Sequence, residues 1–143
     1  MRWRIGLSLA VLLGAVAIGM AAAEQAGEES PSAKATRKKL LQKITLDAKE
    51  IGFKDFTDDI KLELDKPVSF KIDNVSGISN NSKVSYTCKD KTLEQVLNEM
   101  ADKYEFGWYV VSNPKDRLDG WIMIRKHKEK ERGYEAGKEP KKL

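Results

Sequence analysis

The sequence has little of two residue types that catalytic and metal sites often use. It contains one cysteine, Cys88, and one histidine, His127, among 143 residues. A single cysteine cannot form a disulfide within the chain, and one cysteine with one histidine cannot complete a four-ligand zinc site. The sequence also has no glycine-rich phosphate loop. We therefore expect no catalytic residues, no metal site and no cofactor, so that the protein is not an enzyme.

The folded part also lacks an excess of positive charge. The formal net charge of the chain is +4, but residues 44–124 contain 11 basic and 15 acidic side chains. A nucleic-acid-binding domain would concentrate positive charge on its folded surface. We therefore expect no nucleic-acid partner. The basic residues lie in the flanking segments, and membrane contact is expected only through these basic tails.

The first 23 residues have the three parts of a signal peptide. Arg2 and Arg4 form a charged start, residues 5–20 are uncharged and mostly apolar, and residues 21–23 are three alanines. The apolar run is short for a transmembrane helix, which needs about 20 residues. We expect cleavage after Ala23 and a periplasmic or secreted protein. An uncleaved membrane anchor is the alternative.

Two further segments have the composition of flexible chain. Residues 24–43 contain Gly, Ser, Pro and a basic cluster, and they predict a flexible basic linker. Residues 127–143 are rich in Lys, Glu and Gly, and they predict a disordered charged tail. One domain over residues 44–126 remains, which is long enough to bury one modest core.

This domain repeats itself at a fixed offset of 40 residues. The apolar pattern of residues 44–70 recurs without a gap in residues 84–110, although few residues are identical. A pattern that recurs in register indicates one structural unit used twice. Cys88 takes the place of Ala48 in this alignment, so we interpret it as a small core residue. A disulfide between two chains is the alternative for Cys88.

Each copy of the unit reads as strand, helix, strand. Alternating apolar residues predict strands over residues 44–48 and 84–88. A stripe with helical spacing then follows in each copy, and the second stripe is formed by Leu93, Val96, Leu97, Met100, Ala101 and Tyr104. Apolar runs over residues 68–72 and 108–111 predict the second strands.

Local signals indicate where the helices begin and end. Thr92 is a good N-cap, and Gln95 three residues later completes a capping box. Gly52 is the expected N-cap of the first helix, and Gly107 is expected to end the second helix in a left-handed conformation. A last strand is expected over residues 121–125, after a turn-rich stretch.

The expected fold class is therefore α+β. The order is βαβ, βαβ, β, and it predicts two helices packed with small two- and three-stranded sheets. A ferredoxin-like sandwich is the alternative, but it normally stops at four strands.

One group of residues is a candidate binding surface. If Trp108 and Val110 point to the core, the residues between and after them point the other way. The same alternation on the last strand would leave an outward patch formed by Tyr109, Val111, Trp121 and Met123. Exposed apolar patches commonly mark docking surfaces. The alternative is that Leu40, Leu41 or a second layer of sheet covers this face.

The order of elements and several segments resemble the secretin and TonB short N-terminal domain family. The resemblance lies in the strands ITLDAKEIGF and KVSYTCKD, in the helix and strand LEQVLNEMADKYEFGWYVV, and in the closing GWIMIRK. It covers about residues 44–126. The family's motifs mostly form the core, so they are specific for the fold rather than for a function.

The resemblance implies a periplasmic domain that binds other proteins. In that family two helices pack between a two-stranded and a three-stranded sheet, and the domain begins secretins and some TonB-dependent transducers. We expect this chain to be a stand-alone exported domain that docks to an envelope secretion or transport component. A small-ligand or cell-wall glycan binding domain, using Trp108, Tyr109 and Trp121, is the alternative. The sequence leaves the oligomeric state and strand order open.

Overall fold

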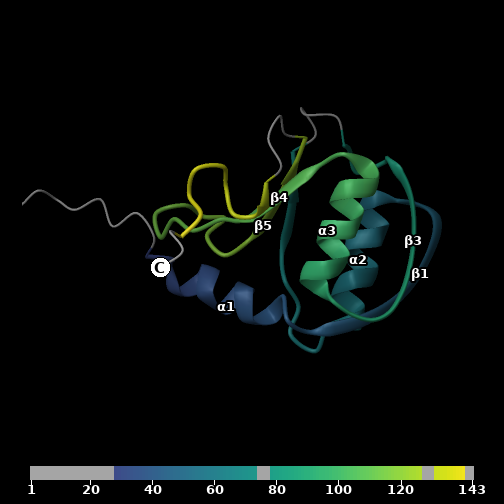
Figure 1. Cartoon of the computed structure of the whole chain (residues 1–143), viewed down its shortest axis with the longest axis horizontal. Coiled ribbons are helices and arrows are strands. Elements are labelled where there is room, and N and C mark those ends of the chain that lie inside the picture. Colours follow the sequence, from purple (N-terminus) through teal and green to yellow (C-terminus); the bar gives the residue numbers. More distant parts are fainter. Residues whose placement is uncertain (1–27, 74–77, 127–130, 141–143) are drawn as a thin grey trace, which may run out of the picture.

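The computed structural model describes residues 28–73, 78–126 and 131–140 (Figure 1). The expected signal peptide over residues 1–23, with its cleavage site after Ala23, lies outside these residues, as does His127. The elements in chain order are α1 (Pro31–Lys39), β1 (Lys43–Gly52), α2 (Phe53–Glu63), β2 (Phe70–Ile72), β3 (Lys83–Thr92), α3 (Leu93–Tyr104), β4 (Gly107–Val110), β5 (Ile122–Arg125) and β6 (Arg132–Gly133).

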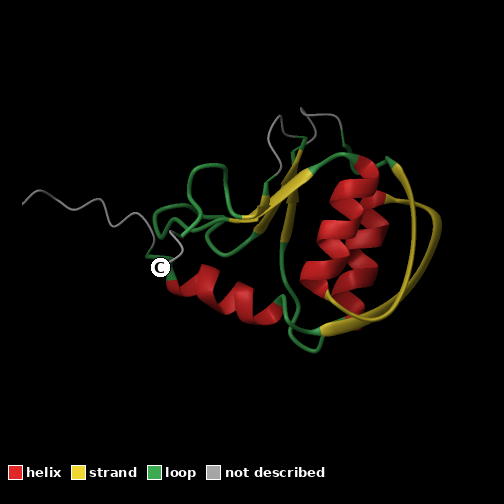
Figure 2. Cartoon of the chain, in the orientation of Figure 1, coloured by secondary structure: helices red, strands yellow, loops and turns green. Residues whose placement is uncertain are grey.

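These elements form successive layers. Helices α2 and α3 lie between a two-stranded sheet, β1-β3, and a four-stranded sheet of order β2-β5-β4-β6, while α1 lies on the other side of the larger sheet (Figures 1 and 2). The predicted α+β class with two helices packed on small sheets is confirmed. The ferredoxin-like alternative is wrong, because the strands form two separate sheets. The larger sheet has four strands rather than three, because β6 joins it.

The two halves of the repeat meet in the two-stranded sheet. Strands β1 and β3 are antiparallel, and Leu46 pairs with Cys88 while Ala48 pairs with Tyr86. Adding 40 to a residue number in the first half gives its counterpart in the second, so the second of these pairs is the first with the halves exchanged. The register is therefore symmetric, as it would be between two copies of one strand.

The same symmetry appears at an irregular position of each strand. Glu50 and Asp90 lie 40 residues apart and have φ angles of 50° and 52°, a conformation that is uncommon for residues other than glycine. The strand register shifts beside both. The Glu50 N–H donates to Ser85 Oγ, and the Asp90 N–H donates to Thr45 Oγ1. Each half thus fixes the bulge of the other with an equivalent hydroxyl.

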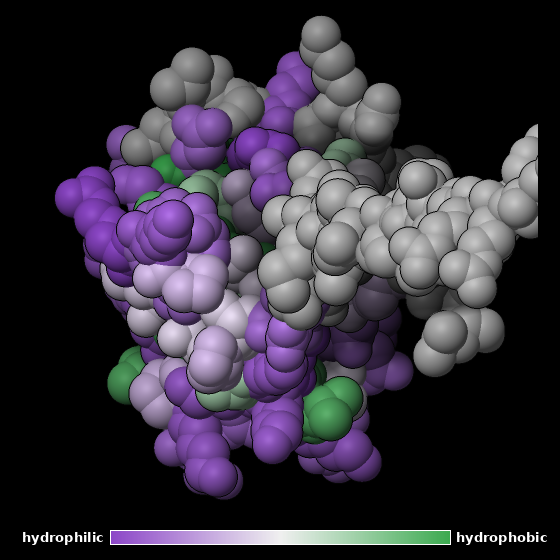
Figure 3. All heavy atoms as spheres, turned by 90° about the vertical axis from the view of Figure 1, so that its left-hand side faces the viewer, coloured by the Kyte–Doolittle hydropathy of each residue, from purple (hydrophilic) through white to green (hydrophobic). Residues whose placement is uncertain are grey.

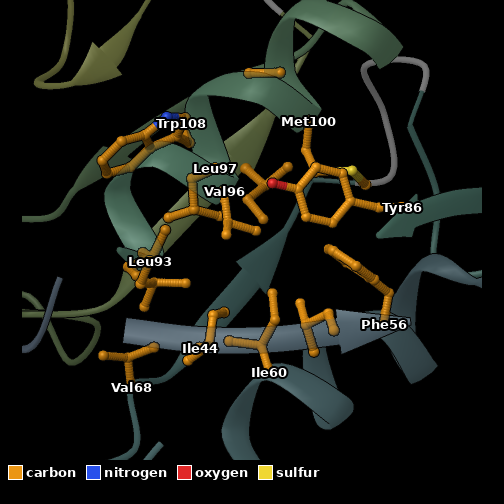
Figure 4. Close-up of a cluster of buried hydrophobic side chains, with 14 of the residues drawn as sticks. Ile44, Phe56, Ile60, Val68, Tyr86, Leu93, Val96, Leu97, Met100 and Trp108 are labelled. Carbon is orange, nitrogen blue, oxygen red and sulfur yellow. The ribbon is translucent and has the colours of Figure 1, made fainter. Parts of the chain in front are cut away.

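The hydrophobic core lies between the two sheets (Figure 4). The rings of Phe53 and Phe106 pack edge to face with centroids 5.5 Å apart. Trp108 on β4 is fully buried, and its indole N–H donates to Asn98 Oδ1 at 3.0 Å. Cys88 is also buried, as its place in the repeat predicts. Apolar burial of this kind is the main favourable term in folding.

The predicted start of each long helix is confirmed. Thr92 caps α3, and both hydrogen bonds of the capping box with Gln95 are present. Gly52 is the N-cap of α2, where its extended backbone makes no side-chain bond. The predicted end of α3 is wrong. Glu105, not Gly107, takes the left-handed conformation with φ 55°, and Gly107 is the first residue of β4.

The predicted flexible linker is wrong over residues 31–39, which form α1. The helix has a defined start, because the Ser30 hydroxyl accepts a hydrogen bond from the Ala33 N–H and Pro31 takes the first helical position. Ala33 and Thr36 are buried. Thr36 Oγ1 donates to the Gly120 carbonyl, which ties α1 to the loop before β5.

The predicted disordered tail is also wrong where the structure describes it. Arg132 and Gly133 form β6, which pairs in parallel with β4. The Arg132 guanidinium bonds Asp102 Oδ1 at 2.6 Å, and the Glu131 side chain is only 3% exposed. A short strand held by ion pairs has no hydrophobic pattern, so composition alone suggests disorder. Residues 127–130 and 141–143 of the predicted tail lie outside the described part.

Candidate interaction groove

The outer face of the four-stranded sheet carries three of the four residues that we proposed as a docking patch. Trp108 and Val110 belong to the main core, whereas Tyr109 and Val111 lie outside that cluster. Tyr109 pairs directly with Met123 across β4 and β5. The alternation of the strand therefore brings Tyr109, Val111 and Met123 to one face, opposite α2 and α3.

These residues do not form an exposed patch. Tyr109 and Val111 are each only 8% exposed, and Met123 is half-buried. Helix α1 and residues 131–140 lie on this side of the sheet (Figure 1). Leu40 and Leu41, the cover considered above, play different parts, because Leu40 belongs to the core and Leu41 is 65% exposed.

The surface view shows the same result. On the side of the molecule that carries α1 and the C-terminal segment, the described residues are mostly hydrophilic or neutral, and hydrophobic colour is confined to small separate areas (Figure 3). A large apolar docking patch is therefore replaced by a partly polar surface.

Trp121 is separated from the other three residues. It lines a small hollow of about 310 Å³ together with Ser32 and Thr36 of α1 and Pro67 and Val68. Its backbone belongs to the turn before β5, where the Trp121 N–H donates to the Leu118 carbonyl. The turn directs this side chain toward the lower end of α1 rather than toward Tyr109.

Tyr109, Val111 and Met123 instead form the floor of a larger groove of about 780 Å³. This volume lies in the range of about 300–1,000 Å³ that is usual for binding sites. The walls come from α1 with the residues before it, from the loop after β4, and from the C-terminal segment. The wall residues with ionisable side chains are Glu28, Glu29, Lys34, Arg37, Asp116, Tyr134, Glu135, Lys138 and Glu139.

The groove has an excess of negative charge. Five carboxylates line it against three cations. Arg37 pairs with Glu29, and Lys138 pairs with Glu135 at 2.6 Å. Among the described residues, no ion pair involves the remaining carboxylates, which are Glu28, Asp116 and Glu139. Lys34 is the one lining cation without an ion pair in the same part of the chain.

Tyr109 is the most deeply placed polar side chain of the groove. Burial raises the pKa of its phenol, while the neighbouring Arg125 opposes that shift and the carboxylates of Glu135, Glu131 and Asp116 reinforce it. The Arg125 guanidinium lies 5.0 Å from the ring centroid. Within residues 28–73, 78–126 and 131–140, the Tyr109 hydroxyl makes no hydrogen bond.

Arg125 is held in place by a buried carboxylate. Its Nη2 atom lies 2.6 Å from Glu131 Oε1, and its Nε donates to the second oxygen at 3.2 Å. This pairing raises the pKa of Arg125. The bidentate contact fixes both the guanidinium beside Tyr109 and the start of the C-terminal segment.

Sequence reasoning missed the residues that build the walls. Arg37 stacks on Tyr134, with its guanidinium carbon 3.7 Å from the ring centroid, and it donates to the Gly133 carbonyl at 2.9 Å. Ser30 followed by Pro31 is a helix-start signal that could have revealed α1. Nothing comparable in the sequence marks the two residues of β6.

The described residues also limit the other kinds of site. No group of three or more His, Cys, Asp or Glu side chains among them is placed to hold a metal ion. In the part of the chain that the structure describes, no helix has the length and apolar character needed to cross a membrane.

Comparisons with known proteins add no further constraint. No model of a known protein family matches the chain, and neither the curated proteins nor the solved structures give a match.

Proposed function

We propose that this protein is an exported, non-catalytic interaction module that docks to a secretion or transport component of the cell envelope. Its groove over Tyr109, Val111 and Met123 is the observation that carries the proposal. The groove combines an apolar floor with charged walls, which is the composition expected of a surface for a partner protein rather than of a packed core.

Two features of the sequence support the same function. The N-terminal 23 residues have the pattern of a signal peptide, and this pattern supports export to the periplasm or beyond. The strand and helix pattern of residues 44–126 resembles the secretin and TonB short N-terminal domain family, whose members bind proteins in the periplasm. Two helices between two small sheets agree with the fold implied by that resemblance.

The alternative of a glycan-binding or small-ligand domain receives less support. It requires the rings of Trp108, Tyr109 and Trp121 to line one pocket. Trp108 is fully buried on the inner face of the sheet, Tyr109 lies in the groove, and Trp121 lies in the separate small hollow. The three rings therefore do not form one stacking platform.

Site-specific photocrosslinking in source cells tests the proposed function. A photoreactive residue at Asn113, an exposed residue of the groove, is compared with one at Leu62, which is 84% exposed on α2 across the sheet. We expect the probe at Asn113, and not the one at Leu62, to capture a component of a secretion or transport machine. Equal capture from both positions, or none from either, would contradict the proposal.

A further inference from the structure

The groove has a chemistry that selects one kind of partner segment. We propose that it binds a stretch of a partner protein that carries lysine or arginine side chains. This inference rests on the proposed function and names the partner chemistry of the same site. It depends on two independent observations, which are the charge of the walls and the unpaired hydroxyl on the floor.

The walls offer negative charge that the chain does not neutralise itself. Glu28, Asp116 and Glu139 line the groove, are exposed, and have no ion pair among the described residues. Lys34 is the one opposing cation that is also unpaired there. A ligand with two or more positive side chains would therefore balance the groove, whereas an acidic ligand would add to its charge.

The floor offers a hydrogen-bond donor that nothing in the described chain accepts. Tyr109 is 92% buried by its 8% exposure, and its hydroxyl has no partner within the described residues. A buried hydroxyl without a partner costs free energy, which a ligand with an acceptor recovers. The carboxylates that raise the pKa of Tyr109 include Glu135 and Asp116, both lining residues, so the phenol belongs to the same charged space.

A basic peptide satisfies both features at once. Its backbone carbonyls can accept from the Tyr109 hydroxyl, and its cationic ends can approach Asp116 and Glu139. The aliphatic stems of lysine and arginine side chains pack well on apolar surface. Val111 and Met123 provide such a surface on the floor of the groove.

Fluorescence anisotropy with defined peptides tests the proposal. The probe is a fluorescein-labelled octapeptide of alternating lysine and serine, and glutamate replaces lysine in its counterpart. The protein is produced from its full-length sequence and used as the cell processes it. We expect saturable binding of the lysine probe that weakens as ionic strength rises to about 1 M, because salt screens exposed charges. Equal binding of the glutamate probe would overturn the proposal.

Two variants connect this binding to the groove. Reversing two wall charges with Asp116→Lys and Glu139→Lys should weaken binding about tenfold, since each exposed pair contributes modestly. The matched control is Glu63→Lys with Asp65→Lys, two exposed carboxylates at the end of α2, which should leave binding unchanged. Equal losses in both double variants would mean that only net charge matters, and this would overturn the proposal.

The hydroxyl is tested by Tyr109→Phe, which keeps the ring and removes one oxygen atom. We expect about fivefold weaker binding of the lysine probe, the value of one ordinary hydrogen bond. Unchanged binding would overturn the role assigned to Tyr109. Circular dichroism of each variant verifies that the fold is retained.

A last comparison excludes occupation by the chain's own end, where the sequence is Lys141-Lys142-Leu143. Removing these three residues should leave the affinity for the lysine probe unchanged. A tenfold gain would show that the groove already serves the chain's own end, and it would overturn the assignment to a partner. Capture at Asn113 with no binding of the lysine probe would overturn the basic-peptide inference and leave the proposed function in place.

Discussion

The two faces of the four-stranded sheet are built in different ways. The inner face presents fully buried Trp108, Ile122 and Ile124 to α2 and α3. The outer face is covered by α1 and the C-terminal segment, which are held largely by hydrogen bonds and ion pairs such as Arg125–Glu131. The inner face is stabilised mainly by apolar burial, and the outer face by a small number of polar contacts.

The difference separates stability from recognition. Close-packed apolar cores tolerate little change in shape, because each lost group leaves a cavity. A cover held by a few polar contacts leaves room beside it, as the groove does. We therefore expect substitutions on the inner face to affect folding of the whole domain, and those on the outer face to act mainly on the cover.

The largest effect is expected from Trp108→Ala on the inner face. The side chain is fully buried, so its removal should lower the free energy of unfolding by about 3–5 kcal/mol. Met123→Ala on the outer face, where the side chain is half-buried, should cost about 1 kcal/mol. Urea unfolding followed by far-UV circular dichroism measures both. Similar losses for the two variants would remove the distinction between the faces.

A smaller effect is expected where α1 meets the sheet. Gly120 has φ +82°, and a Cβ atom there would lie 2.8 Å from the Cβ of Ser32 on α1. Gly120→Ala should therefore cost about 2 kcal/mol and should speed hydrogen exchange in α1 more than in α3.

Gly137→Ala is the matched control for this substitution. Gly137 has nearly the same angle, φ +79°, but nothing lies within 4 Å of the added atom. It therefore isolates the cost of the backbone conformation from that of the contact. If both variants lost the same stability, the close approach of α1 would contribute nothing.

The next effect concerns the ion pair of the outer cover. Glu131→Gln keeps the size of a side chain that is 3% exposed but removes its charge, so the bond to Arg125 weakens. We expect a loss of about 1.5 kcal/mol, because Arg125 itself remains partly hydrated. Thermal unfolding of Glu131→Gln, Arg125→Gln and the double variant measures the coupling of the pair. Strictly additive losses would show that the two side chains are not coupled.

The smallest effect is expected on α3, away from both faces. The bonds from Lys91 and then Tyr86 lower the pKa of Glu99. The unfolded chain therefore binds this proton first, and the stabilisation present above the ordinary glutamate pKa of about 4.3 is lost as the pH falls below it. Since the Glu99 side chain is 45% exposed, the contribution should be below about 1 kcal/mol.

Glu99→Gln tests this pH dependence. The difference in free energy of unfolding between wild type and variant should shrink between about pH 5 and pH 3. A difference that stays constant over this range would show that ionisation of Glu99 does not stabilise the fold.

The inner face could be predicted from the sequence, since it depends on periodicity. The offset of 40 residues and the alternation of each strand placed Trp108 and Val110 in the core, and the capping box located the start of α3. These signals are local, and they agree with the tertiary packing. The sequence therefore indicated both long helices and the strands on either side of them.

The outer face could not be predicted in the same way. In α1 only Ala33 and Thr36 are buried, so the helix has no apolar stripe that a sequence pattern could reveal. Its position depends on contacts with residues 112, 119 and 120, which are distant in the sequence. The walls of the groove are therefore a product of tertiary contacts, and the exposed patch expected from alternation alone was wrong.

The register of β1 and β3 has a consequence for how the domain can be taken apart. Each half supplies the partner strand of the other through equivalent pairs, including the bulges at Glu50 and Asp90. In symmetry terms, the two-stranded sheet is an isologous interface within a single chain. Two separate chains that each carried one copy of the unit would meet the same backbone geometry, so this part of the fold has the form of a dimer joined into one polypeptide.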